Sequence, residues 1–501
     1  MFSSFRNKLK RGDSKQNPQG RRRSATTPDG KRRSLPERQQ YRRPEFLKLT
    51  EEQLAASVNF ETRPILIPNN QWSLPWKAGY AECIHAGGKS KQNEDQAAVG
   101  EIRLELQVPA NTPQTLDGEE ESPPTTPNGN QVKFKESGSL RAVYFGVFDG
   151  HAGAGVSLMV ADQFINHLQE KLVEARAELF RCAYPELYDV ENNFWYPKNY
   201  PKSLFTVDNL VTGALEAAFQ AMDEQIARES VSFYLPGGCT ALVALFILGK
   251  LYIANAGDCR AVIFTENETM QMSEEFTPDR ERERINLLGY CRPDLLHGLF
   301  TYKTFWRMPR SPNEVGKKML CRGPMDQGWH YETVTTEDLG KLPLVPYVDD
   351  KKWAPIRLMG TIGVTRGFGD FDLFEPVSRS VPVKPFLSCV PEVTVIDLRD
   401  RKLTAEDVLV IGSDGLWDRA SNKLIGAEVR NALASQDVNR EQLNIYCHAA
   451  ERVLRFARGT YQQGWKQPSG REASFDDLTA FVIPLHEVVQ VTSLSRHSPE
   501  N

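Results

Sequence analysis

Residues 143–151 read Val-Tyr-Phe-Gly-Val-Phe-Asp-Gly-His, a compact run of β-type residues that ends in an acid, a glycine and a histidine. Aromatic and β-branched residues in a short run are typical of a buried strand. An acid at the end of such a strand, next to a residue without a side chain, directs its oxygens out of the sheet. The stretch therefore predicts a sheet with a polar site at one strand end.

The same pattern, a short β-type run that ends in carboxylates beside glycine, recurs along the chain. The other occurrences are Asn93-Glu94-Asp95, Gly257-Asp258, Gly415 between Asp414 and Asp418, and Asp476-Asp477. One Asp-Gly pair is a routine turn dipeptide. Several carboxylates in a shared cleft, however, repel one another unless a cation neutralises them, and hard divalent ions prefer oxygen ligands. Because the chain is poor in Cys and His, the series predicts a divalent-metal hydrolase.

The remaining periodicity predicts a mixed domain of strands and helices. Ala241 to Asn255 predicts two strands joined at Gly249-Lys250. Further strands are expected at Val408–Ile411 and Leu478–Leu485. Helical spacing is found at 154–172, at 209–228, around Glu428 and at 441–457.

The ends of the chain differ from its body in charge. Residues 1–45 hold 14 Lys and Arg against 4 Asp and Glu, so the rest of this chain, whose total charge is -4, is acidic. We expect 1–45 and 487–501 to be disordered tails around a body at 75–486. Residues 1–11 place Phe2 and Phe5 at helical spacing among basic residues, which suggests peripheral contact with an anionic membrane. An unstructured tail is favoured over this alternative, because so short a helix is marginal.

Two segments have the composition of insertions. Residues 100–140, which include Glu-Glu-Glu-Ser-Pro-Pro-Thr-Thr-Pro at 119–127, predict a surface insertion between two early strands. Residues 260–360 mix aromatic, basic and proline residues over a length that is too great for a simple loop. We interpret the second segment as a subdomain inserted at the rim of the body.

Other classes of protein are disfavoured by composition. The eight cysteines form no Cys-x-x-Cys pair and the N-terminus lacks a secretory signal. We therefore expect reduced thiols, no zinc site, and a cytoplasmic, nuclear or peripherally membrane-associated protein. No apolar run is long enough to cross a bilayer. The acidic body argues against a nucleic-acid partner. The sequence does not predict an oligomeric state.

Seven motifs follow one another in a fixed order. They are Asn93-Glu94-Asp95-Gln96, Phe148-Asp149-Gly150-His151-Ala152-Gly153, Gly237-Gly238-Cys239-Thr240-Ala241, Ala254-Asn255-Ala256-Gly257-Asp258-Cys259-Arg260-Ala261, Gly363-Val364-Thr365-Arg366-Gly367-Phe368-Gly369-Asp370, Ser413-Asp414-Gly415-Leu416-Trp417-Asp418 and Asp476-Asp477-Leu478-Thr479. Over about residues 75–486 this series resembles that of the PPM family, the type 2C protein phosphatases. Leu-Pro-Trp-x-x-Gly-Tyr-Ala-Glu at 74–82 and the long insertion before Gly363 are most similar to the H, J and M branch.

The resemblance implies an α+β fold, a four-layer α-β-β-α sandwich with two central antiparallel sheets, in which 260–360 is the flap. It also implies hydrolysis of phosphoserine and phosphothreonine in proteins by a water that bridges two Mg²⁺ or Mn²⁺ ions. By motif match the ligands of the two ions are Asp95, Asp149, the Gly150 carbonyl, Asp414 and Asp476. Asp258, with Asp414, matches a third, weaker ion site.

The resemblance assigns further roles beside the ions. Glu94 acts through a metal-bound water and His151 is the general acid for the leaving oxygen. Asp370 and Asp418 are supports rather than ligands, and Arg366 pairs with a core carboxylate.

Two positions depart from the family pattern. Ser90 stands where the family has an arginine that grips the substrate phosphate, and we assign Lys89 as its substitute, although lysine lacks the bidentate fork. Cys259 replaces a serine, with little expected effect. Ser90 is the only support for the rival view that the chain is a phosphatase-like scaffold without activity. A second rival, a nuclease or other phosphoesterase, is disfavoured by the acidic body.

The predicted flap has two possible roles. Its aromatic and basic residues, Trp306, Arg307, Arg310, Lys317 and Lys318, suggest a docking surface for protein substrates. The alternative is a basic rim that attracts phosphate without specificity.

Overall fold

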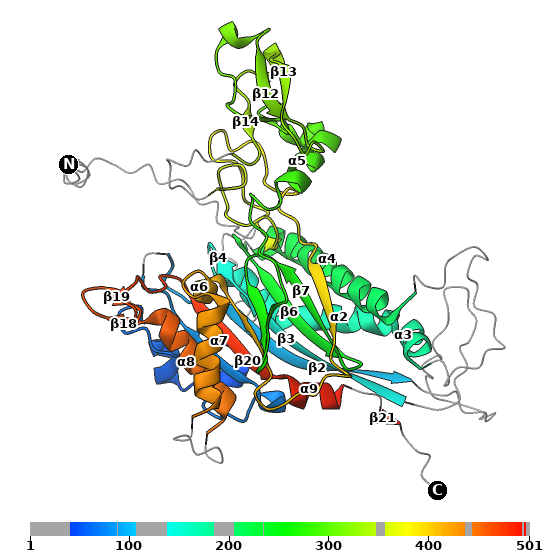
Figure 1. The fold of residues 1–501 in the computed structure, drawn as a ribbon, viewed down its shortest axis with the longest axis vertical. Helices are drawn as coiled ribbons and strands as arrows, with labels where there is room; N and C mark the ends of the chain where they lie inside the picture. The colour runs from blue at the N-terminus through cyan, green and yellow to red at the C-terminus, as the bar shows by residue number, and fades with distance from the viewer. Residues whose placement is uncertain are drawn as a thin grey trace, which may run out of the picture.

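The structure, a computed structural model, describes residues 41–87, 89–106, 138–184, 205–233, 235–346, 356–435, 443–492 and 495–496. Its body is built on two large antiparallel sheets (Figure 1). The first has the order β16 (Glu392–Asp397), β7 (Lys250–Ala256), β6 (Ala241–Ile247), β3 (Gly138–Phe148) and β2 (Gln96–Leu106), with β21 (Ser495–Arg496) beside β3. The second has the order β1 (Gly79–Cys83), β20 (Leu478–Pro484), β17 (Val408–Gly412), β8 (Arg260–Phe264) and β9 (Thr269–Gln271).

Strand β3 shows how the sequence builds the core. Because side chains alternate across a strand, Val143, Phe145 and Val147 belong to the apolar cluster between the two sheets. Tyr144 points the other way, into the cluster under the helices. Phe145 meets Phe481 of β20 with ring centroids 5.5 Å apart, so the two sheets pack face to face. The predicted α+β character is confirmed by this arrangement.

Helices cover the outer faces of the sheets (Figure 1). The six-stranded sheet packs against α2 (Gly155–Glu174), α3 (Arg176–Ala183) and α4 (Val207–Phe233). The five-stranded sheet packs against α7 (Asn422–Leu433) and α8 (Ile445–Arg458). The spacing predicted α2, α4, α7 and α8, but not α3. In the described parts of the chain, no helix combines the length and apolar character needed to span a membrane.

The predicted hairpin is also present, as β6 and β7. Its turn lies one residue earlier than expected, at Leu248 and Gly249, with φ of 55° and 71°. Two consecutive positive φ values give the turn the twist that joins neighbouring strands.

A subdomain projects from the body (Figure 1). Its elements are α5 (Arg282–Cys291), β10 (Phe300–Thr301), β11 (Thr304–Phe305), β12 (Lys318–Arg322), β13 (His330–Thr333) and β14 (Leu342–Pro343). It has an apolar core of its own, in which Ile285, Leu344 and Phe386 are fully buried. The expected start of this insertion at residue 260 is wrong, because 260–264 and 269–271 are strands β8 and β9 of the body.

Other predicted boundaries also change. The insertion expected at 100–140 is narrower, because β2 extends to Leu106 and β3 begins at Gly138; residues 107–137 lie outside the described residues. The tail expected at 487–501 is wrong for its first residues, which belong to α9 (Leu485–Val491). At the other end, the body begins before Pro75, where it was expected to start. Arg43 and Leu47 are buried and helix α1 (Glu51–Ala56) follows them, so the tail expected at 1–45 ends earlier than predicted. Residues 1–40 lie outside the described residues.

A candidate metal centre at the ends of both sheets

The acidic residues predicted from the sequence lie at strand ends. Asp95 directly precedes β2 and Asp149 directly follows β3, whereas Asp258 lies between β7 and β8. Asp414 begins α6 (Asp414–Trp417) just after β17, and Asp476 lies two residues before β20. Strands of both sheets therefore deliver carboxylates to one cleft.

Three of these carboxylates lie together. Oxygen atoms of Asp149, Asp258 and Asp414 are all within 4.8 Å of one another, although the residues are far apart in sequence. The three side chains are half-buried. The predicted gathering of strand-end acids is confirmed for this set.

Asp95 adds a carboxylate at the base of the cleft. Its Oδ2 accepts a hydrogen bond of 2.7 Å from the Ser413 hydroxyl. Its Oδ1 is buried and, among the described residues, has no hydrogen-bond partner. An orphaned carboxylate oxygen in a buried position is costly unless a cation binds it.

The electrostatics of the cluster are those of uncompensated negative charge. Burial, and then the neighbouring Asp477, raise the pKa of Asp95 to about 8. Burial and repulsion by Asp414 raise the pKa values of Asp149 and Asp258 well above the usual range. Burial, followed by Asp476, raises the pKa of Asp414 to about 7. A hard divalent cation would remove this repulsion, so the donor set fits Mg²⁺ or Mn²⁺.

Gly150 brings two chain segments into close approach. A Cβ atom at this position would lie 2.4 Å from the carbonyl oxygen of Glu94, so only glycine fits here. The same carbonyl accepts a hydrogen bond of 2.6 Å from the Ser157 hydroxyl of α2. Burial raises the pKa of the Glu94 carboxyl. The contact fixes the Glu94–Asp95 loop against the end of β3.

His151 is held by Asp370. The His151 Nε2 lies 2.9 Å from both carboxylate oxygens of Asp370. The two residues are brought together by a small sheet of β15 (Phe368–Gly369), β5 (Gly238–Cys239) and β4 (Gly150–His151). Burial alone would lower the pKa of His151, but the Asp370 carboxylate has the larger effect, so the pKa is raised. The expected hydrogen-bonding role of Asp370 is confirmed.

A cavity of about 350 Å³ opens over these groups. It is lined by Lys89, Glu94, Asp149 and His151 from the body, and by Arg357, which directly precedes Leu358 of the projecting subdomain's apolar core. Lys89 forms an ion pair with Asp476. Burial alone would lower the pKa of Lys89, but the Asp476 carboxylate has the larger effect, so the pKa is raised. The sequence analysis missed Arg357, which has no motif around it.

Asp477 is a second residue whose role was missed. Its carboxylate accepts hydrogen bonds from the backbone N–H groups of His85, at 2.7 Å, and Glu94, at 2.8 Å. Burial raises its pKa to about 7. It therefore ties the loop that carries Asp476 to the loop that carries Asp95.

Arg366 lies at the base of the projecting subdomain. It forms an ion pair with Glu281, whose carboxylate is only 7% exposed, at 2.8 Å. Arg284 donates to the same carboxylate at 2.7 Å. Burial raises the pKa of Glu281, but Arg366 outweighs it and the pKa is lowered. The expected pairing of Arg366 with a core carboxylate is confirmed.

Comparison with known proteins places these residues in a family context. Residues 126–290 and 349–459 match the sequence model of a family described as "Protein phosphatase 2C". "Protein phosphatase 1H" of Homo sapiens is 38% identical over 483 residues, which cover 90% of this chain and 92% of that protein. "Protein phosphatase 1J" of Rattus norvegicus is 38% identical over 458 residues, which cover 89% of this chain and 86% of that protein. A solved structure of "serine-threonine phosphatase 2C from Toxoplasma gondii" aligns with a TM-score of 0.41 and 17% identity over 84% of this chain and 99% of that chain, too loosely to equate individual residues. The matched ranges contain Asp149, Asp258 and Asp414.

Proposed function

This chain belongs to the protein phosphatase 2C family, and from that premise we propose that it removes phosphate from phosphoserine and phosphothreonine residues of protein substrates. The observation that carries the proposal is the cluster of Asp149, Asp258 and Asp414, whose oxygens lie within 4.8 Å. The orphaned Asp95 Oδ1 extends this cluster. Mg²⁺ or Mn²⁺ is the cofactor class that such oxygens favour.

We assign the metal-binding roles residue by residue. Asp95, Asp149, the Gly150 carbonyl, Asp414 and Asp476 would hold two ions tightly, and Asp258 would share a third, weaker one with Asp414. When bound, the ions would lower the pKa of a water molecule between them and neutralise phosphate charge. Glu94 would orient water at the edge of the cleft.

His151 is the proposed general acid. Its imidazole lines the cavity, and Asp370 favours its protonated form. A protonated imidazole there can give its proton to the serine or threonine oxygen as that oxygen leaves phosphorus.

Lys89 is the proposed contact for the substrate phosphate. It lines the same cavity as Glu94 and His151. It also directly precedes Ser90, which stands where the family has its arginine. We expect Lys89→Ala to raise KM for a phosphopeptide, whereas Lys91→Ala, which changes a neighbouring lysine outside this cavity, leaves KM unaltered. An unaltered KM in Lys89→Ala would retire the assignment.

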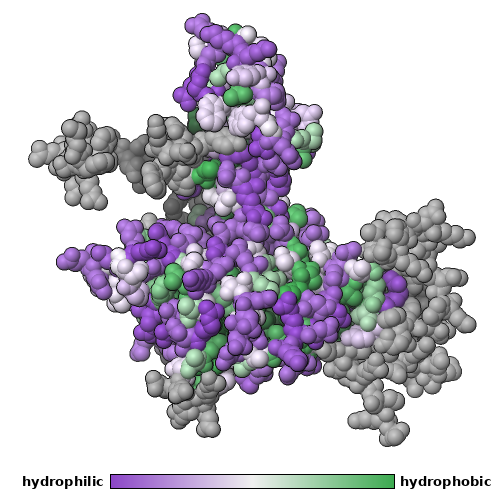
Figure 2. All heavy atoms as spheres, viewed as in Figure 1, coloured by the Kyte–Doolittle hydropathy of each residue, from purple (hydrophilic) through white to green (hydrophobic). Residues whose placement is uncertain are grey.

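The two packed sheets with helices on their outer faces support the finer assignment of a four-layer sandwich, with the projecting subdomain as the flap. Trp306, directly after β11, and Tyr331, in β13, are 75% and 66% exposed. The surface of the projecting subdomain is otherwise mostly hydrophilic (Figure 2). Exposed aromatic side chains amid charged residues suit protein recognition. We propose that the flap docks protein substrates. Replacing residues 282–345 with the same segment of a relative should redirect substrate preference, and an unchanged preference would leave a passive rim.

The location of the protein in the cell and its partners are proposed from the composition of the chain. We place the protein in the cytoplasm, with the nucleus or a membrane surface as further locations and no nucleic-acid partner. Residues 1–11 would provide the peripheral membrane contact. Loss of membrane association in Phe2→Asp/Phe5→Asp would support that contact, and unchanged association would remove it.

Hydrolysis assays test the activity directly. The protein should release phosphate from p-nitrophenyl phosphate and from a phosphothreonine peptide with Mn²⁺ or Mg²⁺, lose activity in EDTA, and lose it in Asp149→Ala. Absence of hydrolysis with either metal would favour the scaffold alternative. Cleavage of a nucleic acid instead of the phosphopeptide would favour the nuclease.

A further inference from the structure

The segment that precedes the first strand of the body, residues 41–66, is part of the fold rather than a tail. Leu47 is fully buried in the cluster between the sheets. Phe46 packs edge-on against Tyr80 of β1, with ring centroids 4.9 Å apart. Leu66 exchanges backbone hydrogen bonds with Glu82 at the edge of the five-stranded sheet. The segment thus runs along β1, behind the metal centre.

Arg43 is the first of two buried arginines in this segment. Its side chain is 1% exposed and forms two hydrogen bonds of 2.6 Å with the Glu82 carboxylate. Its remaining nitrogen, Nη1, donates to the backbone carbonyls of Asn93, at 3.2 Å, and Asp95, at 2.8 Å. Glu82 anchors the guanidinium, which in turn holds the loop that carries Glu94 and Asp95.

Arg63 is the second, and it is fully buried. Its guanidinium donates to the carbonyls of Ile84 and Ser474, each at 2.8 Å, and Asp476 at 3.2 Å. It also lies over the ring of Trp465, 5.2 Å from the centroid. Its backbone has φ of 45°, a left-handed conformation that costs energy for a residue other than glycine. The fold keeps this conformation and so delivers the guanidinium to the loop that carries Asp476.

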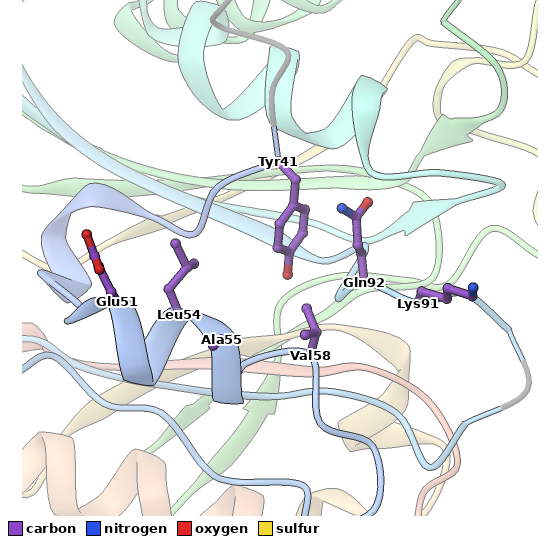
Figure 3. Close-up of a pocket in the computed structure, with 7 residues that line it drawn as sticks. All are labelled: Tyr41, Glu51, Leu54, Ala55, Val58, Lys91 and Gln92. Atoms are coloured by element: carbon purple, nitrogen blue, oxygen red, sulfur yellow. The ribbon is translucent and has the colours of Figure 1, made fainter.

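The two arginines therefore hydrogen-bond to the two loops that carry the proposed metal ligands Asp95 and Asp476. Asp477 connects the same loops through the N–H group of Glu94. Figure 3 shows the neighbourhood: Tyr41 and Leu54 of the segment face Gln92 and Lys91 of the Asp95 loop across a pocket of about 710 Å³. Arg43 therefore supplies charged hydrogen bonds from the segment to the backbone of this loop.

We propose that Arg43 and Arg63 are positioning residues of the metal centre, which set the direction of Asp95 and Asp476 through backbone carbonyls. The proposal rests on the proposed function, because it needs those two residues to bind metal. Groups that orient the ligands of a metal commonly change its affinity about 10-fold to 100-fold when they are mutated. A guanidinium has five donors in a fixed plane, and an ammonium cannot hold two carbonyls in the same geometry.

Conservative variants separate positioning from simple stabilisation. Arg43→Lys and Arg63→Lys keep the charge and lose the fork. Gln53→Ala is the matched control: it breaks the capping box of α1 in the same segment, where Gln53 and Thr50 exchange hydrogen bonds, and in the described structure its side chain bonds to neither metal-ligand loop. Because a buried lysine can fail to fold, Arg43→Met with Glu82→Gln removes both buried charges and tests the same carbonyl contacts.

The experiment is a calorimetric titration of the EDTA-stripped, full-length protein with Mn²⁺, with Tm measured in EDTA beside it. We expect a Kd for Mn²⁺ that rises about 10-fold or more in the arginine variants and the double variant. In Gln53→Ala, Tm falls and Kd stays within twofold of wild type. Arginine variants whose Tm falls while Kd is unchanged would overturn the proposal. Wild-type protein that binds no Mn²⁺ would instead overturn the proposed function.

Discussion

Two regions of the molecule handle buried charge in opposite ways. The metal pole, defined here as Asp95, Asp149, Asp258 and Asp414, gathers acids that form no ion pair within the described part of the chain, and the pKa of each is raised. The flap root, defined as Glu281, Arg284 and Arg366, surrounds one acid with two arginines, and the pKa of Glu281 is lowered.

The difference separates a site built for a ligand from a site built for stability. Repulsion at the metal pole costs folding free energy that a bound cation returns, whereas the flap root is complete without any ligand. Residues that are unfavourable for stability but favourable for function are typical of active sites. The contrast predicts that mutations at the two regions have opposite effects.

The largest effect is expected for Asp149→Asn. Activity should fall roughly a thousandfold, about 4 kcal/mol of transition-state stabilisation, because a proposed metal ligand is lost. In EDTA, however, urea unfolding should show a more stable protein, because a repelling carboxylate is gone. A variant that is less stable than wild type in EDTA would break the comparison.

The next effect is the loss of folding free energy in Glu281→Gln. It leaves two arginines without their carboxylate and should destabilise the protein by about 3 kcal/mol in urea unfolding. Phosphatase activity per folded molecule should be retained. Glu268→Gln, which breaks a surface contact of 3.9 Å with Arg401, is the control and should change stability by less than about 0.5 kcal/mol. Equal effects of the two variants would show that the flap root is not a special site.

A smaller effect is expected for Asp370→Asn, within the cleft but outside the metal pole. The variant keeps a hydrogen bond to His151 and removes the charge that favours its protonated form. We expect kcat to fall about 10-fold to 100-fold, with the Kd for Mn²⁺ unchanged, because His151 acts on the leaving oxygen. A weakened Mn²⁺ affinity with normal kcat at saturating metal would move Asp370 into the metal pole.

The smallest effect is the pH dependence of the unfolding free energy that Glu281 of the flap root contributes. The pKa of Glu281 is lowered from its ordinary value of 4.5, because Arg366 outweighs burial. Its contribution to stability is therefore complete above the unfolded pKa and is lost as the pH falls through the lower folded pKa. The difference in unfolding free energy between wild type and Glu281→Gln should be constant between pH 6 and 8 and shrink below about pH 4.5. A difference that grows toward low pH would contradict the assigned sign.

The metal pole could be predicted from the sequence because each proposed ligand follows or precedes a recognisable strand. Asp149, Asp258 and Asp414 meet as predicted, although each Asp-Gly pair alone is only a turn signal. Strand β2 was missed beyond residue 100 even though Ile102 and Leu104 alternate with charged residues, because the loop composition that follows dominated the interpretation.

The contacts of Arg43 and Arg63 that support the metal pole could not be predicted from the sequence. Arg43 and Arg63 bind backbone carbonyls, which any residue can supply, so their partners leave no trace in the sequence. Arg43 lies at the end of the basic stretch 1–45, and Arg63 precedes the body that was predicted to begin near Pro75. An arginine in such a position is normally solvated. Only the fold shows that these two are buried.

Binding of divalent cations by the metal pole would be seen directly in an anomalous difference map from crystals grown with MnCl₂. We expect Mn²⁺ peaks within coordination distance of Asp149 and of Asp414, and their loss in Asp149→Asn crystals. A map without peaks at these carboxylates, from protein that hydrolyses phosphopeptides in the same buffer, would contradict it.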